Sequence, residues 1–150
     1  MKEKRMVANV WETPDGTILW SRYAHDFVLY KDENGEEYMI DGGNDYCRMC
    51  NSQKYPMRNL CVFNTDPWDL QRQYILRGTF DSKDQPIWVP LAKLSNKHLE
   101  NIIRDDLEHY GIKSSVWKRE LNYRKKNNMF VEEHSYDREA ISNIVTKKIN

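Results

Sequence analysis

Two turn signals, Pro14-Asp15-Gly16 and Glu33-Asn34-Gly35, separate runs of β-branched and aromatic residues in the first third of the chain. Such runs, bounded by turn residues, are typical of antiparallel strands joined by hairpins. The predicted strands span residues 4–12, 17–21, 26–31 and 37–40. Because Asn-Gly tolerates two successive positive φ angles, we expect a type I′ turn at Asn34-Gly35. The chain therefore begins with a β-meander.

The rest of the chain combines further predicted strands with segments of helical periodicity. After a loop at 41–57, the pattern predicts strands at 58–63, 78–80 and 87–91, with a short helix at 67–74 between the first two. Ser95 is a candidate N-cap for a helix that ends at Gly111, and Ser114 or Ser115 for a second helix at 116–126. Strands followed by helices predict an α+β fold, in which an antiparallel β-meander sheet packs on a C-terminal αα-hairpin.

The length of 150 residues corresponds to one domain. We expect a single α+β domain over 1–128 and a C-terminal appendage over 129–150. Ile141, Ile144 and Val145 lie at helical spacing, so the appendage is predicted to be helical or partly disordered. The nine Tyr, five Trp and four Phe supply large rings for a core.

The charge pattern narrows the classes of partner. The 23 basic and 23 acidic residues cancel, and the two halves of the chain differ only mildly in charge. This balance argues against nonspecific duplex binding, which needs a large field of one sign. The first ten residues carry no apolar signal segment, and no apolar run is long enough to cross a membrane. Three cysteines fit a reducing compartment, so we expect a soluble intracellular protein with no membrane partner.

Polar residues at the predicted strand ends form the candidate ligand site. Arginine binds phosphate groups bidentately, and a glycine pair such as Gly42-Gly43 permits positive φ or close approach of the backbone to a ligand. Neighbouring residues on a strand point to opposite faces, so His25 and Asp26 do not form a simple acid–base pair. No catalytic residue is assigned. The candidate ligand-binding residues are Arg22, His25, Asp26, Asp41, Arg48 and Arg77.

Cys47 and Cys50 form a C-x-x-C pair that raises the question of zinc. A structural zinc site needs four ligands, and Cys61, His25 and His98 are the available additions. Their spacing matches no recognised zinc motif. The sequence assigns no metal or cofactor and leaves zinc binding at the cysteines open.

The predicted helix at 116–126 carries a basic face with an aromatic residue in it. Arg119, Tyr123 and Lys126 share this face at i, i+4 and i+7. Cations interleaved with a ring bind phosphates and stack a base in single-stranded nucleic acid. Cations are also favoured at a helix C-terminus by the helix dipole without any ligand.

The run from Thr13 to Arg48, followed by Arg77-Gly78-Thr79-Phe80, Trp88-Val89-Pro90-Leu91 and Glu120-Leu121-x-Tyr123-Arg124, resembles a family of small accessory proteins of tailed phages and prophages. The resemblance covers about residues 12–126. The chain departs from the family pattern at Ala24, where a basic residue is expected, and at Cys47 and Cys50.

The resemblance implies a noncatalytic phage accessory protein in the host bacterial cytoplasm. Such a protein binds a host protein or sequesters a nucleotide-type ligand as a counter-defence, and a homo-oligomer fits this role. The first alternative is a nucleic-acid-binding protein that uses the helix at 116–126. The second is an enzyme that processes nucleotides or nucleic acid, which requires His25 to cluster with two carboxylates.

Overall fold

The computed structural model describes residues 3–50, 55–105 and 112–136. It confirms the α+β class, with antiparallel sheets and a late helical pair. The elements are β1 (Met6–Glu12), β2 (Ile18–Ser21), β3 (Val28–Lys31), β4 (Glu37–Asp41), β5 (Arg48–Cys50), β6 (Arg58–Asn59), β7 (Val62–Phe63), α1 (Trp68–Tyr74), β8 (Leu76–Phe80), β9 (Pro86–Pro90), the 3-10 turn η1 (Leu91–Lys93), α2 (Asn96–Asp105) and α3 (Ser114–Lys126). None of the helices described is long and apolar enough to span a membrane.

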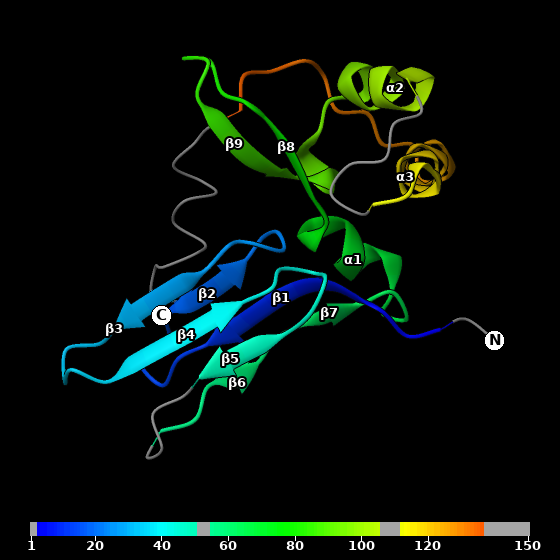
Figure 1. Ribbon diagram of the computed structural model, residues 1–150. Coiled ribbons are helices and arrows are strands. Elements are labelled where there is room, and N and C mark those ends of the chain that lie inside the picture. The colour runs from blue at the N-terminus through cyan, green and yellow to red at the C-terminus, as the bar shows by residue number, and fades with distance from the viewer. Residues whose placement is uncertain (1–2, 51–54, 106–111, 137–150) are drawn as a thin grey trace.

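The strands form three antiparallel groups, with orders β2-β1-β6, β3-β4-β5 and β8-β9. Strand β2 is buried along its whole length. Its Leu19 packs with Tyr38 and Ile40 of the β3-β4-β5 sheet, whereas its Ile18 and Trp20 pack on the opposite side. Figure 1 shows α1 between these strands and the part of the molecule formed by β8, β9, α2 and α3. The αα-hairpin therefore shares its core with β9, and Val7 of β1 packs at the margin of the same cluster.

Three hairpins share the same three-residue loop. In each, the N–H of the first residue donates to the carbonyl of the fifth, over Thr13–Thr17 (2.9 Å), Asp32–Glu36 (3.0 Å) and Asp81–Gln85 (2.9 Å). The fourth residue has positive φ: 85° at Gly16, 81° at Gly35 and 58° at Asp84. This is a type I turn followed by a left-handed residue. The type I′ turn expected at Asn34-Gly35 is wrong, because Asn34 has no positive φ and the Asp32 carboxylate instead accepts hydrogen bonds from the N–H groups of Asn34 and Glu36.

Asp84 is the one of these three left-handed positions that is not glycine. We expect Asp84→Gly to stabilise the protein by about 0.5 kcal/mol. Glycine adopts the left-handed conformation without the steric cost that an L-residue has, and this gain outweighs the added entropy of glycine in the unfolded chain. The melting temperature should rise by about 1–2 °C in differential scanning calorimetry.

The reverse change, Gly35→Asp, is the matched control for Asp84→Gly. A Cβ at Gly35 would meet only the end of the Lys31 side chain, at 3.9 Å, so its cost comes from the backbone. We expect this variant to melt below the parent protein. A lower melting temperature for Asp84→Gly would contradict the assignment.

The helix ends agree with the sequence in part. Ser95 caps α2, since its Oγ accepts from the N–H of His98 at 3.1 Å. The cap expected at Ser114 or Ser115 is wrong: α3 begins at Ser114 itself, Lys113 is the N-cap residue, and no side chain caps the helix. Asn128, with φ of 54°, ends α3 as expected. Leu107, Tyr110 and Gly111 lie outside the described residues.

Two other expectations differ from the structure in detail. The loop predicted at 41–57 contains β5, which pairs with the edge of β4. The strand predicted at 58–63 is two short strands, β6 and β7, which both pair with β1; the register shifts within the β1–β7 pairing, between Met6 and Ala8. Residues 129–136 form no helix and lie along α2, where Val131 and Asn96 exchange backbone and side-chain hydrogen bonds. Residues 137–150 of the predicted appendage are outside the described residues.

A buried ionic network joins all three helices. The Glu120 carboxylate of α3 accepts two hydrogen bonds from Arg72 of α1, at 2.9 and 2.7 Å, and one from Arg124 at 2.8 Å. Arg124 also donates to Asn96 Oδ1 at the start of α2 and to the Leu91 carbonyl of η1. Glu120 and Arg124 are fully buried. One carboxylate therefore pairs with two guanidinium groups and fixes the helices relative to each other.

Removal of the Glu120 charge should be strongly destabilising. We expect Glu120→Gln to lower the free energy of unfolding by about 3 kcal/mol, because two buried guanidinium groups lose their counter-charge. Urea denaturation followed by tryptophan fluorescence measures this change. The exposed Glu100 of α2 gives the control variant Glu100→Gln, for which we expect a change within about 0.5 kcal/mol. Equal effects of the two substitutions would contradict the role of the network.

Candidate functional site

Arg22 and Asp26 pair with each other at the bend between β2 and β3. The Asp26 carboxylate accepts from the Arg22 backbone N–H at 2.9 Å and from Arg22 Nε at 2.8 Å. Ser21 Oγ donates to the Asp26 carbonyl at 2.7 Å. These contacts fix the bend. Any ligand role of the pair stays a prediction.

Asp41 and Arg48 form a second pair across the β4–β5 connection. Their side chains meet at 2.5 Å, and Asp41 Oδ1 also accepts from the Gly42 N–H at 2.8 Å. Gly42 and Gly43 both have positive φ, as expected. A Cβ on Gly43 would lie 2.2 Å from the backbone of Tyr23, so the close approach is to the chain itself. The Gly43 N–H donates to Ser21 Oγ at 2.9 Å, which brings the two pairs into neighbouring loops.

The other two candidate ligand residues lie apart. His25 is exposed, and no hydrogen bond joins its ring to a described carboxylate. The clustering with two carboxylates that an enzyme would require is therefore not formed by the described residues. Arg77 lies on β8, on the side of the hairpin that faces α2 and α3.

The basic face of α3 is held against α1. The Arg119 guanidinium lies 4.2 Å above the Trp68 ring, the Tyr123 hydroxyl donates to Asp69, and Arg72 lies over the Tyr123 ring. The hydrogen bond to Asp69 is the first cause that raises the pKa of Tyr123. Of the three residues predicted to bind nucleic acid, only Lys126 has no such contact with α1 among the described residues.

Two cysteines converge on one buried asparagine. Cys47 Sγ lies 3.6 Å and Cys61 Sγ 3.8 Å from Asn9 Oδ1, a side chain from the middle of β1. Burial raises the pKa of Cys61 to about 11. No three His, Cys, Asp or Glu side chains gather as a metal site in the part of the chain that the structure describes, and the side chain of Cys50 lies outside that part.

The raised pKa predicts unequal thiol reactivity. At pH 8 we expect Cys61 to react with iodoacetamide at least tenfold more slowly than exposed Cys47, because only the thiolate attacks and burial disfavours it. Time-resolved peptide mass spectrometry measures both rates in one sample. In denaturant the two rates should converge. Equal rates in the folded protein would contradict the burial of Cys61.

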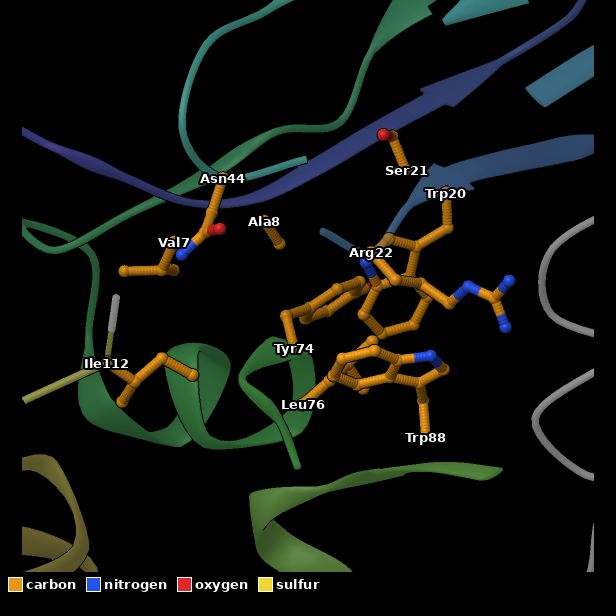
Figure 2. A pocket seen from close by; sticks show the side chains of 10 residues that line it. All are labelled: Val7, Ala8, Trp20, Ser21, Arg22, Asn44, Tyr74, Leu76, Trp88 and Ile112. Carbon is orange, nitrogen blue, oxygen red and sulfur yellow. The ribbon is translucent and has the colours of Figure 1, made fainter. Parts of the chain in front are cut away.

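Aromatic rings fill the seam between the first strands and the β8–β9 hairpin (Figure 2). Trp20 and Tyr74 lie 5.2 Å apart, and Tyr23 stacks on Trp88 at 5.3 Å. The cavity that remains here measures about 10 Å³, which is room for about one water molecule. Figure 2 shows the Arg22 guanidinium pointing away from Val7 and Ile112. The seam is therefore packed and does not accept a ligand.

A much larger cavity, of about 820 Å³, lies next to this seam and shares Val7, Asn44 and Ile112 with it. We call it the basic cavity. It lies between the N-terminal end of β1, the 42–45 loop, α1 and the start of α3. Its charged lining residues are Lys4, Arg5, Lys113, Arg119 and Asp45. Four cations thus face one carboxylate.

The four cations of the basic cavity have no acidic partner within residues 3–50, 55–105 and 112–136. None of them forms an ion pair with any residue that the structure describes. The Lys4 ammonium lies 4.4 Å from the centre of the Phe63 ring, and the Arg119 guanidinium lies over the Trp68 ring. Both contacts are with neutral rings, so the positive charge stays uncompensated.

Asn64 and Gln71 hold the walls of the basic cavity in place. Asn64 Oδ1 accepts from the Arg5 N–H at 2.7 Å, and the Arg5 carbonyl accepts from the Asn64 N–H at 2.8 Å. The buried amide of Gln71 on α1 donates to the carbonyls of Asn64 and Asp66. The segment that carries Lys4 and Arg5 is therefore tied to α1 through one turn.

The N-terminus of α3 also opens on the basic cavity, through Lys113, Ser115 and Val116. Because no side chain caps this helix, the N–H groups of its first turn have no side-chain acceptor. A helix N-terminus carries partial positive charge. It adds to the field of the four cations.

Of the residues that line the basic cavity, the sequence identified only Arg119 as a candidate. Nothing in the sequence indicated that Lys4 and Arg5 line one cavity with Lys113. Comparison with protein-family models, with curated proteins and with solved structures finds no match to this chain.

Proposed function

We propose that this protein is a noncatalytic binding protein whose basic cavity takes a phosphate-bearing, nucleotide-type ligand. The observation that carries the proposal is the set of four cations, Lys4, Arg5, Lys113 and Arg119, that line one cavity and form no ion pair with a described residue. Like charges placed together repel each other, and a bound anion relieves that repulsion. The cavity volume lies within the range of about 300–1,000 Å³ that is usual for small-molecule sites.

The lining favours a nucleotide over a bare anion. The Arg119 guanidinium lies over the Trp68 ring, 4.2 Å from its centre, beside the other cations. Aromatic rings and guanidinium planes are the surfaces on which bases stack, while Lys and Arg bind phosphates. The uncapped start of α3 supplies further N–H donors of the kind that bind phosphate at helix N-termini.

The lining also favours binding over catalysis. Its described residues include one carboxylate, Asp45, and no histidine or cysteine. General acid–base catalysis needs a titratable pair in reach of the reacting atoms. Sequestration needs only affinity, which the cations supply.

The resemblance to phage accessory proteins suggests the setting. In that setting the protein acts in the host bacterial cytoplasm and removes a nucleotide-type signal of host defence, as a monomer or a homo-oligomer. A host protein is the other partner that this resemblance implies. The basic cavity supports the nucleotide because it is concave and cationic, and small ligands bind in such sites.

Calorimetric titration with a panel of mono-, di- and cyclic nucleotides tests the proposal. We expect at least one nucleotide to bind. Lys113→Glu should weaken that binding at least tenfold, because it replaces a cation that donates hydrogen bonds to phosphate by a negative charge that repels phosphate. Lys118→Glu is the matched control: it makes the same charge change on α3, at an exposed residue outside the lining, and should bind within about twofold of the parent.

Three outcomes would overturn this proposal. Equal loss of binding in Lys113→Glu and Lys118→Glu would show that only net charge matters. Consumption of the bound nucleotide, followed by chromatography, would show an enzyme. If single-stranded oligonucleotides bind more tightly than nucleotides and Lys126→Glu weakens them while Lys113→Glu does not, the nucleic-acid alternative on α3 replaces the proposal.

A further inference from the structure

Three buried donor nitrogens lie where β8 faces α3 and have no hydrogen-bond acceptor among the described residues. They are Nε and Nη1 of Arg77 and Nε1 of Trp117. The Trp117 side chain is fully buried, and the Arg77 guanidinium carbon lies 5.4 Å from the centre of its ring. A buried donor without an acceptor is costly, and a buried cation without a counter-charge is costlier still. No described carboxylate pairs with Arg77.

The surroundings of Arg77 explain why the chain itself does not satisfy it. Arg77 lies opposite Val89 in the β8–β9 hairpin. Val89 and Trp117 belong to one apolar cluster with Leu99 of α2. Burial lowers the pKa of Arg77, and no acidic group counteracts the effect. The third guanidinium nitrogen, Nη2, is not among these buried nitrogens without partners, so one edge of the guanidinium remains open to solvent.

His98 of α2 adds a further donor near Arg77. Burial and the Arg77 charge both lower the pKa of His98, which favours the neutral ring. Its Nδ1 lies 3.0 Å from the Tyr136 hydroxyl, and that hydroxyl accepts from the Ser95 N–H at 3.2 Å. When the Tyr136 hydroxyl donates its proton to Nδ1, the neutral ring carries its own proton on Nε2 and has that N–H to offer.

We propose that Arg77, Trp117 and His98 form a second anion site, which takes a single oxyanion group such as a phosphate or a carboxylate. An oxyanion supplies several acceptor lone pairs and the missing negative charge at once, and a guanidinium binds it bidentately through two nitrogens of one edge, here Nε and Nη2. A water molecule accepts at most two of these hydrogen bonds and leaves the charge of Arg77 uncompensated.

This oxyanion site is distinct from the basic cavity. None of its three residues lines that cavity. Helix α3 separates the two, since Val116 and Arg119 face the basic cavity whereas Trp117 faces Arg77. The proposal therefore stands whether or not the basic cavity binds a nucleotide.

Anion-dependent stability of the full chain tests the proposal. The melting temperature is measured in a chloride buffer and after addition of inorganic phosphate or of acetate at equal ionic strength. We expect at least one oxyanion to raise the melting temperature of the parent protein, and Arg77→Met to lose that increment. The response to phosphate against acetate identifies which oxyanion the site prefers. Arg104→Met, at an exposed residue of α2 that pairs with Asp105, is the matched control and should keep the increment.

The indole N–H resonance of Trp117 gives a second readout, in case Arg77→Met folds poorly. Its signal, identified by its loss in Trp117→Phe, should shift when phosphate or acetate is titrated, and should still shift in Lys113→Glu. The proposal is wrong if no oxyanion changes the melting temperature or this signal. It is also wrong if Arg77→Met is more stable than the parent protein by the same amount in every buffer. The oxyanions then contribute nothing to stability, and Arg77 contacts internal water only.

Discussion

The hydrogen bonds between Glu120, Arg72 and Arg124 determine how the second part of this molecule is assembled. Three helices and the 3-10 turn η1 meet at one buried carboxylate, directly or through Arg124. Ionic groups are buried only where their geometry satisfies them, because desolvation is costly. The network therefore permits few relative positions of α1 and α3. Helix α1 in turn is tied to the N-terminal segment through Gln71 and Asn64.

The basic cavity is a consequence of this arrangement. Arg119 precedes Glu120 and stacks on Trp68, whose indole N–H donates to Glu120 at 3.1 Å. The same contacts that orient α3 thus direct its uncapped N-terminus toward Lys4 and Arg5. Cations that are far apart in the sequence gather at one surface because the helices are fixed by buried ion pairs. On its opposite side α3 buries Trp117 against Arg77, where donors are left without acceptors.

Local sequence signals predicted most of the fold. The strands at 17–21 and 37–40, the helix at 67–74, the hairpin at 78–91 and the Ser95 cap all appear, because each depends on residues close in the chain. Two local predictions failed for physical reasons. The Asp32 side chain favours a type I turn over the type I′ turn, and β5 forms in a Gly- and Asn-rich loop only because the edge of β4 is available. The ligand candidates Arg22, Asp26, Asp41 and Arg48 form two ion pairs, Arg22 with Asp26 and Asp41 with Arg48, and their role as ligand residues stays a prediction.

The sequence by itself determined the α+β class, the positions of the hairpins and the amphipathic face of α2, because turn chemistry and hydrophobic period act over a few residues. Only the tertiary structure decided which charges are buried together and which are left unpaired. Glu120 meets Arg72 across 48 residues of sequence, and Lys4 shares a cavity with Lys113. Such contacts depend on how preformed elements pack, and residue type alone does not encode the partner. The basic face of α3 was evident in the sequence. In the folded protein part of this face contacts α1, for the same reason.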